Sequence, residues 1–431
     1  MHTLSHLRRY LRRHLPMGVA LLLAFPAFSA AQTYASLFLF SGSDGKNPIA
    51  PVTVGDHVLY GTTSFGGSAG FGNVFSLTPP AEPGGAWTET VLHVFDGKDG
   101  FSPIAGVVIG PDGVLYGTTY LLGPSKWGTV FSLTPPASPG GSWKETTLHA
   151  FSGTEAAGST DGGGPQAPLT IGSNGVLYGT TTYGGEYGAG TVFAVAPPAS
   201  AGGPWTEAVL HSFGGPGDGT EPIAGLVVGS DKVLYGTTFS GGAYGGGTVF
   251  SLTPSSAAGG HWTERVIYSF SGGDDGDSPY YGSLVMDSGG VLYGTTSTGG
   301  GEDTGTIFSL TPPATAGGPW TERVLHNFNY QACKLPLGGL AINAAGHLFG
   351  TTSTGGSTED EAGAVFQLTP PASPGGEWQF TVLHNFTYNA TEGEVPYAGV
   401  VLSPSGVLFG TTSGLVYGGP ANNGSVFAMA P

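Results

Sequence analysis

The pentapeptide LYGTT at residues 115–119 decides the fold of this chain, because it returns at a nearly constant interval. Its copies, the last two with Phe in place of Tyr, start at Leu59, Leu115, Leu177, Leu234, Leu292, Leu348 and Leu408. The steps between successive starts are 56, 62, 57, 58, 56 and 60 residues. A fixed period of this length is typical of a repeat protein, so the chain is expected to contain seven copies of one structural unit.

Two further sequence marks follow each pentapeptide at similar spacing. The first is Gly-x-Val/Ile-Phe, which ends at Phe75, Phe131, Phe193, Phe250, Phe308, Phe366 and Phe427. The second runs from Trp to Phe and covers residues 87–95, 143–151, 205–213, 262–270, 320–328 and 378–386. Each period holds four runs rich in β-branched and aromatic residues, separated by Gly, Pro, Asp or Asn, which predicts four strands. In the second period these strands are expected at residues 103–109, 114–119, 129–134 and 143–151.

The Trp-led run occurs only six times, and its seventh copy has a counterpart near the start of the chain. Residues 37–40 (LFLF) align with residues 92–95 (LHVF), the end of a Trp-led run. We therefore expect the N-terminal strand to complete the last blade, which leaves no open sheet edge between the first and last units. The predicted fold is all-β: a seven-bladed β-propeller of four-stranded antiparallel blades over residues 32–431. A β-helix or an array of β-sandwiches is the alternative.

The first 31 residues differ in composition from the rest. Four arginines between residues 8 and 13 precede an apolar run at residues 17–28, and small residues follow at 29–31. This order is typical of a secretory signal peptide, cleaved after Ala31. An uncleaved anchor is the alternative, but the apolar run is shorter than the ~20 residues that span a bilayer. We expect an exported protein, periplasmic or extracellular, whose mature chain has no integral membrane segment and is a monomer.

The charge balance restricts the class of partner. Acidic residues outnumber Lys and Arg by 29 to 12, and the formal net charge is −17. A surface poor in Lys and Arg is badly suited to the phosphates of nucleic acids, so nucleic acid is not an expected partner. The single cysteine, Cys333, cannot form an internal disulfide and is expected to be a partly buried bystander. Stability must therefore come from packing and strand pairing.

The combination of marks resembles a known family. LYGTT, a Gly-rich loop, GTVFSLTPP and WTExVLHxF recur in this order in the chain. They resemble the GloVer tandem repeat of exported bacterial proteins, the choice-of-anchor tandem repeat family, over all seven periods. The resemblance implies an exported repeat protein, but it brings no activity and no catalytic residues.

Two sets of loops are expected on one end of the propeller. In a four-stranded blade, the loop between the second and third strands and the loop to the next blade emerge on the same side. Aromatic rings there could stack on a sugar while carboxylates accept its hydroxyl hydrogens. The alternative is that the aromatics pack their own loops and the acids order turns. The predicted ligand-contacting residues are Trp127, Tyr183, Tyr187, Tyr244, Glu302, Asp303, Glu359 and Asp360.

The sequence supports metal binding and catalysis less than it supports ligand binding by the loops. Asp274, Asp275 and Asp277 offer hard oxygen donors and are a candidate calcium site, although the twelve-residue calcium loop is missing. No other cofactor is expected. One histidine per blade recurs on the last strand in most blades, which favours a structural role because residues so far apart cannot converge.

No nucleophile elbow, P-loop or HExxH motif occurs in the sequence. The leading hypothesis is an exported, non-catalytic binding or scaffold module for a glycan or a protein partner. The alternatives are a glycoside hydrolase or polysaccharide lyase acting at the central opening, and a purely structural envelope protein. A hydrolase would need two carboxylates about 5 to 10 Å apart.

Overall fold

The computed structural model describes residues 34–430, apart from 83, 139, 201, 257–259, 316, 331–332, 357–361, 374, 389–391 and 415–422. In this part of the chain the regular structure is β-strand, with one short 3-10 turn, η1 (Pro111–Gly113). No helix in the described ranges is long and apolar enough to cross a membrane. The predicted signal peptide, residues 1–31, lies outside the described residues.

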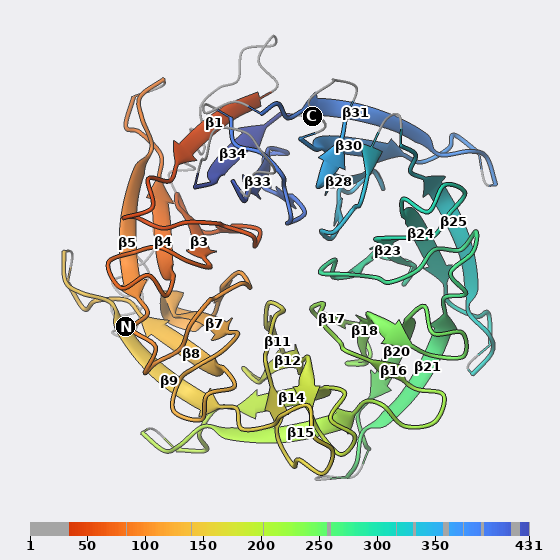
Figure 1. The fold of residues 1–431 in the computed structure, drawn as a ribbon, viewed down its shortest axis with the longest axis horizontal. Helices are drawn as coiled ribbons and strands as arrows, with labels where there is room; N and C mark the ends of the chain where they lie inside the picture. The colour runs from red at the N-terminus through yellow and green to blue at the C-terminus, as the bar shows by residue number, and fades with distance from the viewer. Residues whose placement is uncertain are drawn as a thin grey trace, which may run out of the picture.

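Seven four-stranded antiparallel sheets stand as blades around a central axis, which confirms the predicted seven-bladed β-propeller (Figure 1). The innermost strands are β2 (Thr53–Val54), β6 (Val108–Ile109), β11 (Thr170–Ile171), β17 (Val227–Val228), β22 (Val285–Met286), β27 (Ala341–Ile342) and β32 (Val401–Leu402). The second strands are β3 (Leu59–Thr63), β7 (Leu115–Thr119), β12 (Leu177–Thr181), β18 (Leu234–Thr238), β23 (Leu292–Thr296), β28 (Leu348–Thr352) and β33 (Leu408–Thr412). Each second strand is therefore one copy of the pentapeptide.

The third and fourth strands come from the other two sequence marks. The third strands are β4 (Asn73–Thr78), β8 (Thr129–Thr134), β14 (Thr191–Ala196), β20 (Thr248–Thr253), β24 (Thr306–Thr311), β30 (Ala364–Thr369) and β34 (Ser425–Met429). The outermost strands are β5 (Thr88–Val94), β9 (Lys144–Ala150), β15 (Thr206–Ser212), β21 (Thr263–Ser269), β25 (Thr321–Asn327), β31 (Gln379–Asn385) and β1 (Tyr34–Leu39). The innermost strand of the second blade is shorter than predicted, since only Val108–Ile109 of residues 103–109 form a ladder.

The ring closes through β1, as the sequence predicts. β1 pairs antiparallel with β34, from Tyr34 opposite Met429 to Leu39 opposite Ser425, so residues from the two ends of the chain share one blade (Figure 1). The next residue, Phe40, is buried and its ring lies 5.0 Å from that of Phe75 in the first blade. The N-terminal strand therefore completes the seventh blade and also packs that blade against the first.

The pentapeptide is explained by packing inside and between blades. Its Leu is fully buried in every blade. Its Gly faces the Phe of the neighbouring third strand so closely that a Cβ on Gly236 would lie 2.6 Å from the ring of Phe250. All seven copies show this pairing, with distances of 2.3 to 2.6 Å. The hydrophobic core lies between adjacent blades, as in the cluster that joins Phe213 of one blade to Leu234 and Phe250 of the next.

The Gly236→Ala substitution is expected to lower the free energy of unfolding by about 1–3 kcal/mol, because the added methyl overlaps the ring of Phe250. Urea unfolding would measure this change. Gly301→Ala is the matched control, since a Cβ there meets nothing within 4 Å. In the double variant with Phe250→Leu, the two losses should be less than additive. Additive losses would show that the ring contact is not the reason for the glycine.

Candidate functional site

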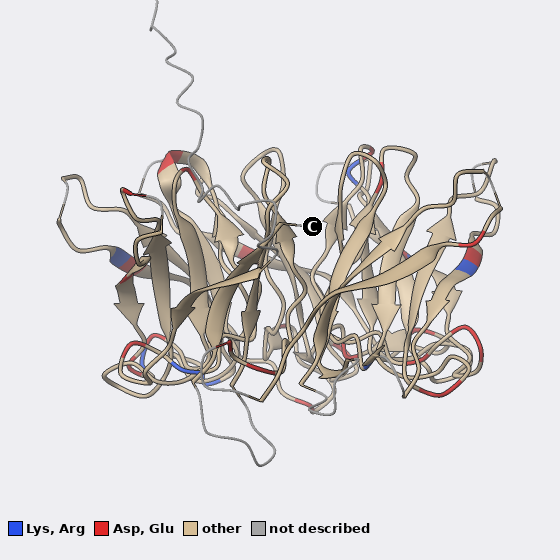
Figure 2. Cartoon of the chain, turned by 90° about the horizontal axis from the view of Figure 1, so that it is seen from above, with Lys and Arg blue, Asp and Glu red and all other residues tan. Residues whose placement is uncertain are grey.

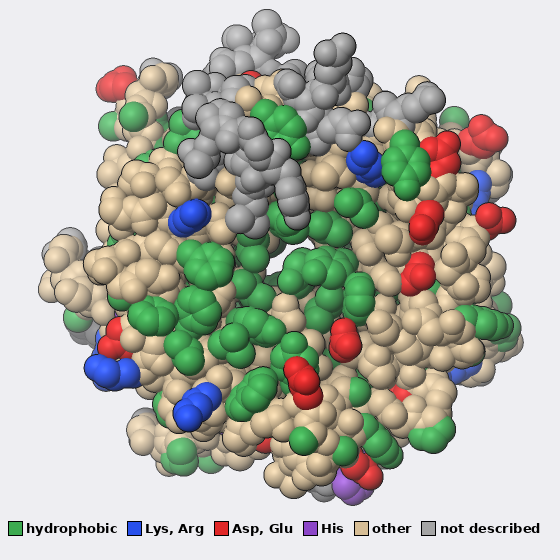
Figure 3. All heavy atoms as spheres, viewed as in Figure 1, with side chains coloured by type: hydrophobic (Ala, Val, Ile, Leu, Met, Phe, Trp, Pro, Cys, Tyr) green, Lys and Arg blue, Asp and Glu red, His purple; other side chains and the backbone are tan. Residues whose placement is uncertain are grey.

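The two sets of loops meet on one face of the propeller, hereafter the loop face, as predicted. Short backbone ladders join the loop entering a blade to the loop after its second strand: β10 (Gly162–Gly163) with β13 (Tyr183–Gly184), β16 (Gly219–Thr220) with β19 (Ser240–Gly241), and β26 (Cys333–Lys334) with β29 (Thr354–Gly355). Acidic residues concentrate in the loops along one edge of the disc in the side view (Figure 2). The loop face surrounds the central opening, and hydrophobic side chains gather around that opening (Figure 3).

The central opening is lined by residues that precede the innermost strands. It contains a cavity of about 150 Å³ whose lining is mostly apolar, including Ile49, Ile104 and Leu340. Three polar residues, Gln166, Tyr281 and Ser283, depart from this pattern. Tyr281 donates its hydroxyl hydrogen to Gln166 Oε1 at 3.1 Å, and the amide of Gln166 donates to Thr182 Oγ1 at 2.6 Å. The structure thus places a hydrogen-bonded pair, Gln166 of the third blade and Tyr281 of the fifth, at a mostly apolar opening.

Tyr281 reaches this position through a one-residue insertion. Six positions separate Pro279 from Val285, the first residue of β22, whereas five separate Pro222 from Val227, the first residue of β17. In the other five blades, the equivalent proline also stands five positions before the first residue of the innermost strand. The fifth blade alone therefore carries an extra residue at the axis, within the pair Tyr280 and Tyr281.

This insertion breaks a hydrogen bond that the other blades make. In six blades, the first Thr of the pentapeptide donates its hydroxyl hydrogen to a carbonyl of the next blade, as from Thr180 to Ala224 at 3.0 Å. Thr237, which faces the fifth blade, has a buried hydroxyl with no hydrogen-bond partner. A buried unpaired hydroxyl is destabilising. The boundary with the fifth blade therefore lacks a stabilising hydrogen bond that the other boundaries have, at the place where Tyr281 enters the opening.

A cluster of aromatic side chains continues outward from Tyr281. The ring of Tyr280 lies 4.3 Å from that of Tyr281 and 5.5 Å from that of Phe239. On the neighbouring side, the hydroxyls of Tyr120 and Tyr183 are 3.2 Å apart. Burial raises the pKa of both Tyr120 and Tyr281 well above the usual value, with smaller contributions from neighbouring tyrosines. These hydroxyls are therefore neutral and can both donate and accept hydrogen bonds.

Two hollows extend this cluster from the axis toward the rim. The inner hollow, of about 500 Å³, is lined by Thr182, Tyr183 and Tyr187 and carries the carboxylates of Glu155 and Glu221. The outer hollow, of about 510 Å³, is lined by Tyr187, Glu186, His211, Asp218 and Glu264, among others. Thr182 joins the inner hollow to Gln166, and Tyr187 stands between the two hollows. We call the row from Tyr281 to Tyr187 the radial row.

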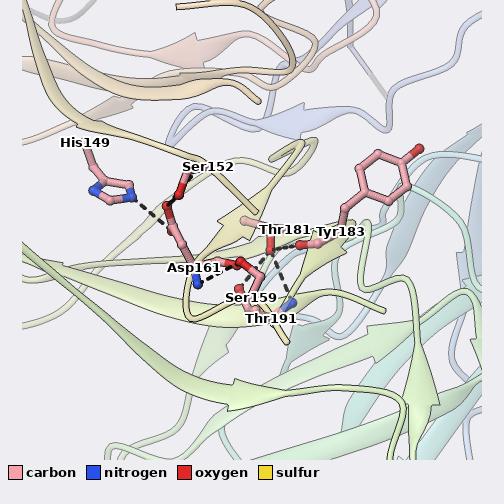
Figure 4. A network of polar contacts seen from close by, with 7 residues as sticks. All are labelled: His149, Ser152, Ser159, Asp161, Thr181, Tyr183 and Thr191. Atoms are coloured by element: carbon pink, nitrogen blue, oxygen red, sulfur yellow. Dashed lines mark hydrogen bonds and ion pairs between the residues drawn. The ribbon is translucent and has the colours of Figure 1, made fainter. Parts of the chain in front are cut away.

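A second arrangement recurs at the outer edge of the disc, where each blade meets the next. His149 Nε2 on β9 lies 3.1 Å from Asp161 Oδ1 (Figure 4). Glu207 of the next blade's outermost strand completes the group. We call such groups rim triads. They are Phe38–Asp44–Glu89, His93–Asp99–Glu145, His149–Asp161–Glu207, His211–Asp218–Glu264 and Tyr268–Asp275–Glu322.

The two remaining boundaries replace the glutamate with an aromatic ring. His326 stacks on Phe380 with ring centroids 4.1 Å apart, and His384 stacks on Tyr34 at 3.9 Å. Burial lowers the pKa of His326 to about 4, so its ring is neutral at physiological pH. The recurring histidines therefore contact the next blade one by one and do not converge on a common centre.

Comparison of the sequence with family models settles its relationship. The model of the Gloeobacter/Verrucomicrobia repeat matches residues 25–202, 145–360 and 256–431, which together cover the whole propeller. The chain belongs to the Gloeobacter/Verrucomicrobia repeat family. The resemblance to the GloVer repeat is thereby confirmed. No curated protein sequence matches the chain.

Several solved structures are similar to this Gloeobacter/Verrucomicrobia repeat protein at low sequence identity and with TM-scores below 0.5. A gluconolactonase-like protein of Bacteroides uniformis is 13% identical with a TM-score of 0.49, over 82% of this chain and 88% of that one. An ulvan-degrading polysaccharide lyase is 10% identical with a TM-score of 0.46, over 89% and 94%. The endosialidase of phage phi92 is 13% identical with a TM-score of 0.43, over 92% and 68%.

The residues predicted to contact a ligand have different positions in this repeat protein. Tyr183 and Tyr187 line the inner hollow together. Trp127 is half-buried and packs against the core between the second and third blades, with its ring 6.0 Å from that of Tyr183. Tyr244 is 70% exposed on the loop after β18. The structure thus brings Tyr183 and Tyr187 into one hollow, with the ring of Trp127 in edge contact with that of Tyr183.

The predicted acidic contacts Glu302 and Asp303 both accept hydrogen bonds from backbone N–H groups, Glu302 from the loop after β25 and Asp303 from its own loop. Glu302 accepts a hydrogen bond from the backbone N–H of Tyr330 at 3.0 Å, and Asp303 accepts one from that of Gly299 at 2.8 Å. Glu359 and Asp360 lie outside the described residues.

The candidate calcium residues also have partners within the protein. Asp275 accepts a hydrogen bond from the Tyr268 hydroxyl at 2.8 Å, and Asp277 accepts one from the Ser278 hydroxyl at 2.5 Å. Asp274 is exposed on the same loop. Calcium binding by Asp274, Asp275 and Asp277 stays a prediction.

The Glu89→Gln substitution is expected to raise the free energy of unfolding by about 1 kcal/mol at pH 8. Burial, with a smaller contribution from Asp44, raises the pKa of Glu89 to about 7, so between about pH 4.5 and pH 7 the folded state keeps a proton that the unfolded chain has lost, and at pH 8 the folded protein must hold a half-buried charge. Stability therefore falls as the pH rises from about 4.5 to about 7 and is level above that. The estimate is discounted because the side chain is only half-buried.

Urea unfolding of both proteins at several pH values would check this. The difference in unfolding free energy between the Glu89→Gln variant and the unsubstituted protein should disappear as the pH falls to about 4.5. The variant Glu186→Gln, at an exposed position, should show no such trend. A gain in stability that is equal at all pH values would rule out the protonation of Glu89 as its cause.

Proposed function

We propose that this protein binds a neutral polysaccharide chain along the radial row of the loop face, without catalysing a reaction on it. The observation that carries the proposal is the one-residue insertion that places Tyr281 at the central opening and leaves Thr237 unpaired. Departures from a local rule that reduce stability are characteristic of functional sites. Residues shared by all blades are explained by the fold, whereas this departure is not.

The chemistry of the row suits a carbohydrate. Tyrosine rings offer apolar faces for stacking, and neutral hydroxyls, the Gln166 amide and the carboxylates of Glu155 and Glu221 offer hydrogen bonds to sugar hydroxyls. The protein has a net charge of −17, which disfavours a polyanionic chain. The succession of opening, inner hollow and outer hollow supports an extended ligand of several sugar units rather than a single monosaccharide.

The distribution of perturbed carboxyl groups supports binding rather than hydrolysis. A glycoside hydrolase needs a carboxylate pair in which one group has a raised pKa close to the scissile bond. The glutamates whose pKa burial raises to about 7 are Glu89, Glu207, Glu264 and Glu322, and each lies on an outermost strand. They recur from blade to blade at the rim, as expected of a structural feature.

The proposed place of action is outside the cytoplasm. The basic and apolar order of residues 1–31 is typical of a signal peptide, and its removal would leave the propeller as the mature, monomeric protein. N-terminal sequencing of the protein from the medium or periplasm should give Gln32 as the first residue. A retained Met1 would contradict the proposed processing.

A glycan array probed with residues 32–431 tests the function. Binding to one class of neutral polysaccharide is expected, and Tyr187→Ala should weaken it at least tenfold because the ring is 45% exposed between the two hollows. Tyr330→Ala is the matched control, since this ring is 59% exposed and lies outside the hollows. Equal losses in both variants, or capture of a protein in pull-downs with no glycan bound, would contradict the proposal.

A further inference from the structure

Two rim triads have the composition and spacing of a transition-metal site. In His149–Asp161–Glu207 and in His211–Asp218–Glu264, one nitrogen and two carboxylate oxygens lie within 4.8 Å of one another. His211 Nε2 is 2.9 Å from Asp218 Oδ2, and His149 Nε2 is 3.1 Å from Asp161 Oδ1 (Figure 4). Three protein ligands of this kind, with a fourth position left for water, are typical of zinc sites.

The hydrogen bond between His and Asp does not explain why a glutamate, Glu207 or Glu264, lies beside them. Glu207 Oε1 and Glu264 Oε1 are buried and have no hydrogen-bond partner. Neither glutamate forms an ion pair with Lys or Arg in the described part of the chain. The nearby Arg265 donates instead to the carbonyls of Gly317 and Gly318. Each triad therefore groups two carboxylates and a histidine without a compensating cation.

The aspartates are held in place by further contacts. Asp161 Oδ2 accepts hydrogen bonds from the backbone N–H and the hydroxyl of Ser152, both at 2.8 Å, which leaves Oδ1 facing His149 (Figure 4). Asp218 Oδ1 accepts a hydrogen bond from the Gly219 N–H at 2.6 Å, which leaves Oδ2 facing His211. Such outer contacts orient metal ligands in proteins.

The other boundaries lack one element of this arrangement. At the boundary of His93, Asp99 and Glu145, Glu145 Oε1 accepts a hydrogen bond from the Thr147 hydroxyl at 3.1 Å and so has a partner. Two boundaries have Phe38 or Tyr268 at the register position of the histidine. Two others have Phe380 or Tyr34 in place of glutamate, stacked on the histidine. The chain thus offers its own negative controls.

We propose that these two rim triads each bind one divalent transition-metal ion of the zinc class. The imidazole ligand favours such an ion over Ca²⁺ or Mg²⁺, which prefer oxygen ligands alone. The second site opens on the outer hollow, whose lining includes His211, Asp218 and Glu264, so an ion can reach it from solvent. A bound ion would join neighbouring blades, since Glu207 and Glu264 come from the blade that follows the histidine.

Isothermal titration of the untagged, EDTA-treated protein with Zn²⁺ tests the proposal, with no glycan present. Two ions per chain are expected, and Co²⁺ should give the absorption of nitrogen and oxygen coordination in place of Zn²⁺. Glu207→Gln and Glu264→Gln should each leave one ion, and the double variant none. Glu89→Gln should still bind two ions.

A second variant keeps the test independent of folding. His211→Tyr copies the natural Tyr268 boundary, where the hydroxyl bonds Asp275, so it should fold and lose one ion. Thermal unfolding without metal should confirm that each variant is folded. Absence of Zn²⁺ binding at millimolar concentration, two ions retained by the double variant, or displacement of Zn²⁺ by equimolar Ca²⁺ would overturn the proposal.

Discussion

A chain that lacks residues 34–40 is expected to lose at least about 5 kcal/mol of unfolding free energy. This deletion removes β1 from β34 and takes away the buried ring of Phe40, together with the partly buried Leu37 and Phe38 that pack on the same cluster. Full burial of one such side chain contributes about 1.5–3 kcal/mol, and the exposed edge of β34 adds to the loss. Urea unfolding of the mature and shortened proteins would measure the difference.

Moving the strand to the other end of the chain tests whether the loss of stability comes from the missing strand alone. Residues 34–40 placed after residue 431, through a copy of residues 371–379 so that Tyr34 takes the register position of Phe380, should return the unfolding midpoint close to that of the intact protein. A synthetic peptide of residues 34–40 should also stabilise the shortened chain by adding a strand to β34. An unchanged midpoint in the shortened chain would show that β1 does not close the ring.

The double substitution Tyr120→Ala and Tyr281→Ala is expected to weaken polysaccharide binding about 100-fold. Each ring offers a stacking surface worth about 0.5–1.5 kcal/mol, and removal of Tyr281 also leaves Gln166 Oε1 without its donor. The sum, about 2.7 kcal/mol, corresponds to two powers of ten in the dissociation constant. Titration of the glycan selected on the array would measure it.

Thr237→Val is the matched control for this loss. The substitution removes the buried hydroxyl that has no partner and leaves the aromatic cluster in place, so it should stabilise the protein and keep full affinity. If Thr237→Val weakened binding as much as the tyrosine substitutions, the effect would come from the shape of the blade rather than from the rings.

The fold could be predicted from the sequence because each structural feature is repeated. Seven copies of the pentapeptide, each followed by Gly-x-Val/Ile-Phe, give seven independent indications of the same pair of strands. The missing Trp-led run and the LFLF segment together predict the closing strand. The first strand of the second blade was predicted too long because residues 103–107 are apolar, but Ile104, Ala105 and Gly106 line the axis and Val107 packs in the core before the ladder begins at Val108.

The candidate site could be predicted only in part. The position of the loop face follows from the order of strands, and Tyr183 and Tyr187 stand out as aromatics in Gly-rich loops. Tyr281 and Gln166 escaped notice because they are 115 positions apart and meet only when the ring closes. A count of residues between each proline and the following strand would have revealed the insertion.

The contact of glutamate with histidine and aspartate in the rim triads could not be predicted from the repeat sequence either. The Glu in the recurring WTE segment has the sequence pattern of an ordinary strand residue, and its neighbours cannot be known from one blade. Glu207 approaches His149 and Asp161 only because consecutive blades pack side by side. The aromatic replacements Phe380 and Tyr34, which stack on His326 and His384, show that this boundary can also be closed without a carboxylate.

The crystal structure of the protein with the tightest-binding oligosaccharide from the array would test the proposed binding site most directly. Sugar rings are expected over Tyr281 at the central opening and over Tyr120, whose hydroxyl lies beside that of Tyr183, with the chain continuing through the inner hollow toward Tyr187. An oligosaccharide bound only on the opposite face of the propeller, or only at the rim with the opening empty, would contradict the proposal.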